Sequence, residues 1–180
     1  MEKILFIYDK LMLVGEQRLV GLNAEFLTFA QVNAKMYWFA DREYGKKRRK
    51  KKRIFLIPKS GTKVCYGALY KIDDYEFAEH KLHSYYYSMK PFIGKEDDEQ
   101  LYVLRNVLAT PIKFDSLSAL QNGKYKTGAK VECETFIGNV KNKVISYNSS
   151  KSYYKIQGID HENFIELVRE KQGEMKHGLE

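Results

Sequence analysis

The chain has 180 residues, of which 44% are hydrophobic and 14% aromatic, enough for one sizeable core, and we expect a single domain over residues 1–180. No run of eighteen apolar residues occurs, and the first ten residues lack the charged head and apolar stretch of a signal peptide. The composition therefore argues against a membrane or secreted protein and predicts a cytoplasmic one.

The net charge of +8 comes from one short segment. Of the 31 Lys and Arg residues, eight are consecutive, so the remainder equals the 23 Asp and Glu residues in number. Because like charges repel and cannot be buried without partners, we expect a solvated basic loop over residues 45–53. Its basic residues are Lys46, Lys47, Arg48, Arg49, Lys50, Lys51, Lys52 and Arg53.

Two uses of this basic loop are open. A cationic loop can neutralise several phosphates of a nucleic acid or bind an acidic protein surface. It can equally fold against the acidic segment 96–99 of the same chain, in which case it needs no partner.

The first elements follow from the apolar pattern. Residues 3–8 form a continuous apolar run typical of a central strand, and residues 14–22 predict a short helix. Residues 28–39 alternate between two faces and predict one long strand.

Beyond the basic loop, residues 54–57 and 63–72 are rich in β-forming side chains. A turn-rich pentapeptide joins them, so we expect a β-hairpin. Asp73 or Asp74 can cap a helix that runs to about Ser84, because a side-chain oxygen there satisfies amides of the first turn.

The last third predicts two more strands, at residues 101–110 and 129–137. Residues 149–156 favour a helical turn or two after a serine cap, and residues 160–172 an amphipathic helix with Phe164, Leu167 and Val168 on its apolar face.

Together these elements predict an α+β fold with a curved, antiparallel or mixed sheet that can close as a small β-barrel with a few flanking helices. Strands and helices do not alternate regularly, which argues against a doubly wound nucleotide-binding fold. Cys65 and Cys133 lie in separate β-like runs without metal-ligand spacing, so we expect buried free thiols. No metal site and no cofactor are expected.

Three segments in this order resemble the gamma-glutamyl cyclotransferase-like superfamily, and the resemblance spans nearly the whole chain. These are Phe-Ile-Tyr-Asp-Lys-Leu at 6–11, Val-Cys-Tyr-Gly-Ala-Leu-Tyr at 64–70 and Ser-Ser-Lys-Ser-Tyr at 149–153. The resemblance implies a small α+β barrel. It also implies a cavity in which related enzymes cyclise gamma-glutamyl groups to 5-oxoproline.

This chain departs from the family pattern at two points. In the family, a Glu after the second segment moves the proton; here Ser84 or Tyr86 takes that position, depending on the alignment, and neither hydroxyl is a base near neutral pH. In the family, amides of a glycine-containing loop hold the substrate carboxylate; here Asp9 replaces the glycine and adds a negative charge.

We therefore expect a non-catalytic protein of this fold, a pseudoenzyme that binds a small, anionic or nucleotide-like ligand. Such a protein can serve as an inhibitor or adaptor, for example in a virus–host setting. The expected ligand-binding residues are Tyr8, Asp9, Lys10, Leu11, Ser84, Tyr85, Tyr86 and Tyr153.

Two alternatives remain. The chain can be an active enzyme with a rebuilt site in which Glu79 or His83 is the base, since imidazole titrates near neutrality. It can also be a nucleic-acid-associated protein that uses the basic loop, with the barrel as a scaffold. His80 and His83 are three residues apart on the expected helix, but two histidines without a third ligand do not define a metal site.

Overall fold

A computed structural model describes residues 3–42, 50–57, 64–75, 78–82, 102–138, 153–156 and 160–178. In residues 35–42, 50–57, 102–103, 137–138, 153–156 and 160–163 it describes the backbone alone. Within the residues that the structure describes, no helix is both long and apolar enough to cross a membrane.

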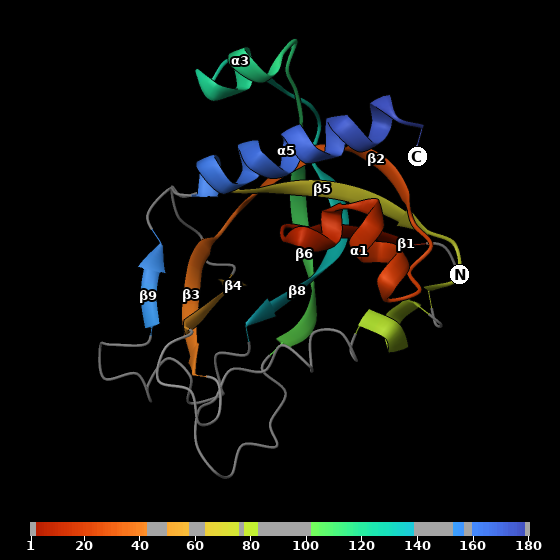
Figure 1. Cartoon of the computed structure of the whole chain (residues 1–180), viewed down its shortest axis with the longest axis vertical. Coiled ribbons are helices and arrows are strands. Elements are labelled where there is room, and N and C mark those ends of the chain that lie inside the picture. The colour runs from red at the N-terminus through yellow and green to blue at the C-terminus, as the bar shows by residue number, and fades with distance from the viewer. Residues whose placement is uncertain are drawn as a thin grey trace.

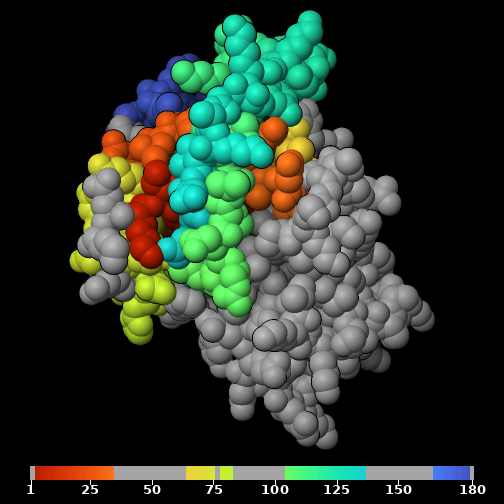
Figure 2. All heavy atoms as spheres, turned by 180° about the vertical axis from the view of Figure 1, so that it is seen from behind, coloured from red at the N-terminus to blue at the C-terminus, as the bar shows by residue number. Residues whose placement is uncertain are grey.

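Five strands close into a mixed barrel, which confirms the predicted α+β class. Their order is β2-β5-β1-β8-β6, and a pairing of β2 with β6 at Ala30↔Pro111 closes the ring. The β1–β8 pairing is parallel, and the other pairings are antiparallel. The strands are β1 (Lys3–Ile7), β2 (Glu25–Asn33), β5 (Val64–Ile72), β6 (Tyr102–Lys113) and β8 (Val131–Gly138). Figure 2 shows β1, β8 and β6 side by side on one face.

A second sheet of three strands has the order β4-β3-β9, with β3 (Lys35–Arg42), β4 (Lys50–Ile57) and β9 (Tyr153–Ile156). It corrects two predictions. The prediction of a single strand over residues 28–39 was wrong, because the strand is interrupted at Ala34 and its two halves belong to different sheets. The hairpin of residues 54–57 with 63–72 was also wrong, since β4 pairs with β3 while β5 pairs with β1 and β2.

Two further boundaries differ from the sequence prediction. The expected basic loop over 45–53 was wrong from Lys50 on, because Lys50 to Arg53 belong to β4 and Lys50 pairs with Arg42 of β3. Lys46 to Arg49 lie outside the described residues. The helical turn expected within residues 149–156 is replaced at Tyr153–Ile156 by β9, which pairs with β3. In both places a cross-strand partner outweighs the local composition.

Short helical segments follow several of the barrel strands. The 3₁₀ turn η1 (Lys10–Met12) and α1 (Val14–Leu19) follow β1; α3 (Leu117–Gln121) and the two-residue β7 (Lys126–Thr127) follow β6. Residues 78–82 are helical, and the amide of Ala78 donates to the carbonyl of Asp74. This agrees with the predicted helix start.

The last helix, α5 (Asp160–Lys176), lies across β5 and β2 (Figure 1). It buries Phe164 and Val168, as its predicted apolar face requires, in a cluster that also contains Phe29 and Tyr70. This cluster forms the main core between the helices and the outer face of the barrel.

The barrel interior is narrow and filled. Phe6, Ala30, Leu69 and Ala109 are among its buried residues. A Cβ atom at Gly67 would lie 2.7 Å from Cζ of Phe6 and 2.4 Å from the carbonyl oxygen of Ile7, so only glycine fits there. The glycine of the second segment therefore has a packing role in this chain.

Cys65 and Cys133 are both buried free thiols in this interior, as predicted. Burial raises the pKa of the Cys133 thiol to about 12, so it carries no thiolate at neutral pH.

Candidate functional site

Residues of the loop after β1 form hydrogen bonds with one another. Asp9 is the N-cap of η1, and its Oδ1 accepts a hydrogen bond of 2.9 Å from the amide of Leu11. The amide of Met12 donates to the carbonyl of Asp9, and that of Leu13 to the carbonyl of Lys10, each at 3.0 Å. The amides of Leu11, Met12 and Leu13 thus have acceptors within the loop.

Two carbonyl groups of the same loop accept hydrogen bonds from buried side chains. Gln17 donates from Nε2 to the carbonyl of Leu11 at 2.8 Å, and the Tyr70 hydroxyl donates to the carbonyl of Met12. Burial raises the pKa of Tyr70, so this phenol remains a donor. Because both hydrogen bonds come from buried side chains, the loop has a fixed geometry.

The structure places four of the predicted ligand-binding residues together and assigns them unlike roles. Tyr8 is 6% exposed and donates a 2.7 Å hydrogen bond to the carbonyl of Phe136, so it supports the barrel. Leu11 is fully buried, Asp9 is partly exposed and caps η1, and Lys10 is exposed.

Five other predicted site residues are not described by the structure, or only their backbone is. Ser84, Tyr85, Tyr86 and His83 lie outside the described residues. The backbone of Tyr153 pairs with Phe39 in the second sheet, and its side chain is outside the description.

A second group of charges lies at the start of β1. Lys3 makes a 2.5 Å ion pair with Glu134, and the Tyr75 hydroxyl donates to the other carboxylate oxygen at 2.7 Å. Burial and Glu134 raise the pKa of Tyr75, with a smaller contribution from the charge of Glu79.

Tyr75, on which the charge of Glu79 acts, lies against Lys3 at the start of β1, whereas Asp9 lies two residues beyond the end of this strand. Within the described part of the chain, no group of three His, Cys, Asp or Glu side chains is placed to hold a metal ion.

The start of α1 has an acceptor that sequence analysis missed. Glu174 of α5 accepts hydrogen bonds from the amides of Val14 at 3.0 Å and Gly15 at 3.2 Å. These residues are about 160 positions apart, and no local pattern indicates the contact. The cap of η1 by Asp9 did have a signal, since Asp commonly accepts from the amide two residues further on.

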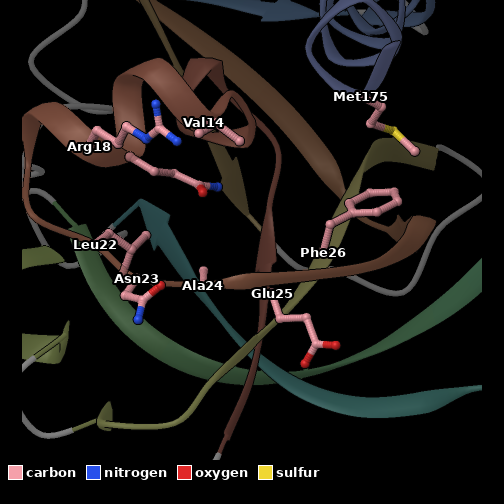
Figure 3. A pocket seen from close by; sticks show the side chains of 9 residues that line it. Val14, Arg18, Leu22, Asn23, Ala24, Glu25, Phe26 and Met175 are labelled. Atoms are coloured by element: carbon pink, nitrogen blue, oxygen red, sulfur yellow. The ribbon is translucent and has the colours of Figure 1, made fainter. Parts of the chain in front are cut away.

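A pocket of about 570 Å³, which we call the α1–α5 pocket, lies between α1, the start of β2 and the end of α5. Figure 3 shows Phe26 and Met175 facing each other, with Arg18 and Val14 projecting from α1. Its lining residues are Val14, Gln17, Arg18, Leu22, Asn23, Ala24, Glu25, Phe26 and Met175. None of them was predicted from the sequence to bind a ligand.

Comparison with solved structures shows the fold. A structure of a gamma-glutamyl cyclotransferase matches 96% of this chain and 81% of its own length, with 13% identity and a TM-score of 0.51. A glutathione-specific gamma-glutamyl cyclotransferase from yeast matches 93% of this chain and 87% of its own length, with 10% identity and a TM-score of 0.47. Kluyveromyces lactis allophanate hydrolase matches 93% of this chain and 22% of its own length, with 12% identity and a TM-score of 0.49.

No protein-family model matches the chain, and no curated protein matches it by sequence. The first structural match and the closed mixed barrel together show a gamma-glutamyl cyclotransferase-like fold, as the three sequence segments indicated. At this level of identity the match defines the fold alone.

Proposed function

We propose that this chain is a non-catalytic binding protein on a gamma-glutamyl cyclotransferase-like fold. The observation that supports this most directly is the 2.9 Å hydrogen bond between the Asp9 carboxylate and the Leu11 amide. In the family that the sequence resembles, amides of this loop hold the substrate carboxylate. Here a carboxylate of the protein itself takes that place.

Asp9 opposes the family substrate in two ways. A substrate carboxylate would have to displace an existing charge-assisted hydrogen bond at the Leu11 amide. It would also lie within a few ångströms of a second negative charge, and like charges so close raise the free energy of binding.

The proton-transfer step also lacks its group. Counting without gaps puts Ser84 where the family has its Glu, and aligning Leu82-His83 with the family's Leu-Asp pair puts Tyr86 there. The charge of the alternative base Glu79 acts on Tyr75, whose hydroxyl donates to Glu134 near the start of β1. The absence of the family's Glu and the acceptor that the Leu11 amide already has together favour binding over cyclisation. The exposed Lys10 is the cation that meets a ligand at this loop.

The test measures release of 5-oxoproline from gamma-glutamyl amines and peptides, with Glu79→Gln as a second sample. We expect the wild type to release no more 5-oxoproline than a protein-free control. Release that Glu79→Gln abolishes would show the rebuilt enzyme instead, and release of any other origin would equally end the proposal.

A binding measurement tests the role of Asp9 separately. We expect 5-oxoproline to bind Asp9→Gly more tightly than the wild type, since the variant frees the Leu11 amide and removes the charge. Asp9→Asn keeps the acceptor without the charge and should fall between the two. If the wild type binds 5-oxoproline most tightly, Asp9 does not block this loop.

A second candidate function rests on the basic segment. Lys50 to Arg53 lie in β4, and their backbone pairs with residues 39–42 of β3. The backbone of a paired ribbon is already ordered, which lowers the ordering cost of binding a polyanion. We propose polyanion binding here as an additional activity, independent of the loop after β1.

A further inference from the structure

We propose that the α1–α5 pocket binds a small organic anion with an apolar body. This inference goes beyond the proposed function, because it concerns a second site with a ligand class of its own. The pocket is separate from the loop after β1: Gln17 contacts both, but the other lining residues come from α1, the α1–β2 connection, β2 and α5.

One wall of the pocket is a fixed aromatic surface. The ring of Phe26 packs edge-on against Phe29, with centroids 5.0 Å apart, and against Tyr70 at 5.7 Å. Lys171 adds a cation 5.0 Å from the Phe26 centroid. A ring held by these neighbours offers apolar surface without a large entropy cost on binding.

The opposite wall is adaptable. Met175, in the last turn of α5, is 46% exposed and faces Phe26 across the pocket (Figure 3). A thioether side chain adjusts to ligands of different shape and packs well on aromatic groups. Phe26 and Met175 together offer an apolar surface for the flat or aliphatic body of a ligand.

The charge on the pocket comes from Arg18. It is exposed on α1, and within the described part of the chain it has no hydrogen bond or ion pair. Its planar guanidinium can bind a carboxylate through two parallel hydrogen bonds. Of the nearby carboxylates, Glu25 lies 3.9 Å from Lys71, and Glu174 accepts hydrogen bonds from the amides of Val14 and Gly15. Both negative charges thus have partners of their own, and Arg18 is the lining cation open to an anion.

The size of the pocket limits the ligand. A volume of about 570 Å³ is within the range of small-molecule sites and far too small for a folded partner. The ligand class is thus a monocarboxylate whose ring system or short chain reaches from Arg18 to Phe26.

The test uses 2-naphthoate as the probe and its neutral analogue 2-naphthamide, titrated into the full chain at pH 7 and followed by fluorescence. We expect saturable binding of 2-naphthoate, about tenfold weaker in Arg18→Gln, because a bidentate charged contact is lost. Arg105→Gln is the matched control, since Arg105 is an exposed arginine of β6 outside the pocket.

A second pair of variants tests the apolar wall. Met175→Glu places a carboxylate at the pocket and should weaken 2-naphthoate binding about tenfold or more. Leu108→Glu makes the same kind of change at an exposed residue of β6, 52% exposed, and should leave binding within about twofold.

Three results would overturn the proposal: no saturable binding, equal affinity for the acid and the amide, or equal effects of Arg18→Gln and Arg105→Gln. The proposed function can fail separately. If the chain releases 5-oxoproline while Arg18→Gln still weakens 2-naphthoate binding, the non-catalytic assignment is wrong and the pocket assignment stands.

Discussion

The side-chain Oε1 of Glu174 lies 3.0 Å from the backbone nitrogen of Val14, so the last helix of the chain caps the first α-helix. The second oxygen accepts from Gly15, and the two bonds satisfy amides that have no acceptor within α1. Val14 and Glu174 are 160 positions apart in the sequence, so this contact joins α1 to α5 on the outer face of the barrel, beside the α1–α5 pocket.

Removing this cap should destabilise the protein. We expect Glu174→Ala to lower the free energy of unfolding by about 1–2 kcal/mol, as for the loss of other side-chain caps. Urea unfolding followed by circular dichroism measures the change. Glu170→Ala, at an exposed position of α5, is the control and should stay within about 0.5 kcal/mol of wild type. Equal effects of the two substitutions would argue against the cap.

Lys171 makes the stability depend on pH. Its side chain is fully buried, and burial lowers its pKa from 10.5 to about 8, although Glu174 partly offsets the shift. Because the folded-state pKa lies below the unfolded one, the unfolded chain binds more protons between about pH 8 and 10.5, and Lys171 costs most stability below pH 8.

Lys171→Met should therefore raise the free energy of unfolding near pH 7 by about 1–2 kcal/mol, with cation–π contacts reducing the gain. The gain should shrink as the pH approaches 10.5. Differential scanning calorimetry of wild type and variant at several pH values measures this difference. Lys176→Met, at an exposed position of the same helix, serves as control. A gain that stays constant with pH would mean that Lys171 is not the titrating group.

Gly67 should not tolerate a side chain. In Gly67→Ala the new methyl would lie 2.4 Å from the carbonyl oxygen of Ile7, a backbone atom that cannot turn aside. We expect a loss of about 3 kcal/mol or more in unfolding free energy, or failure to fold. Gly173→Ala, in α5 with no atom within 4 Å of the new methyl, should be neutral or slightly stabilising. A stable Gly67→Ala protein would show that the barrel interior is looser than described.

The thiols should react only when the barrel opens. Cys133 has a pKa of about 12 and, like Cys65, is buried in the barrel interior. We expect reaction with an aromatic disulfide reagent at pH 8 to be slow in buffer and complete in denaturant. Rapid reaction of either thiol in the native state would contradict the closed barrel.

The basic ribbon should bind polyanions in a salt-dependent way. We expect the triple variant Lys50→Thr/Lys51→Thr/Lys52→Thr to elute earlier from heparin than wild type, and binding to single-stranded nucleic acid to fall steeply with salt. Threonine keeps the β preference of the strand. The matched control removes the same charge from three exposed lysines, Lys124, Lys126 and Lys130. If both triple variants elute alike, the effect is net charge rather than the ribbon.

Some of the candidate site could be predicted because its cause is local. Asp9 accepts from an amide only two residues away, and an Asp after an apolar strand indicates such a turn. Glu174 could not be paired with Val14 in advance, because only the packing of α5 on the barrel brings them together. The same holds for the α1–α5 pocket, whose lining comes from both ends of the chain.

Most barrel strands and the last helix could be located from hydrophobic periodicity, since this is a property of neighbouring residues. The barrel class, the free thiols and the altered loop at Asp9 were also predicted from the residues. The strand pairings depend on tertiary contacts. These contacts interrupt the expected strand at Ala34, pair β4 with β3 rather than β5, and make a strand of residues 153–156. Pairing depends on partners distant in the sequence, and those partners exist only once the chain has folded.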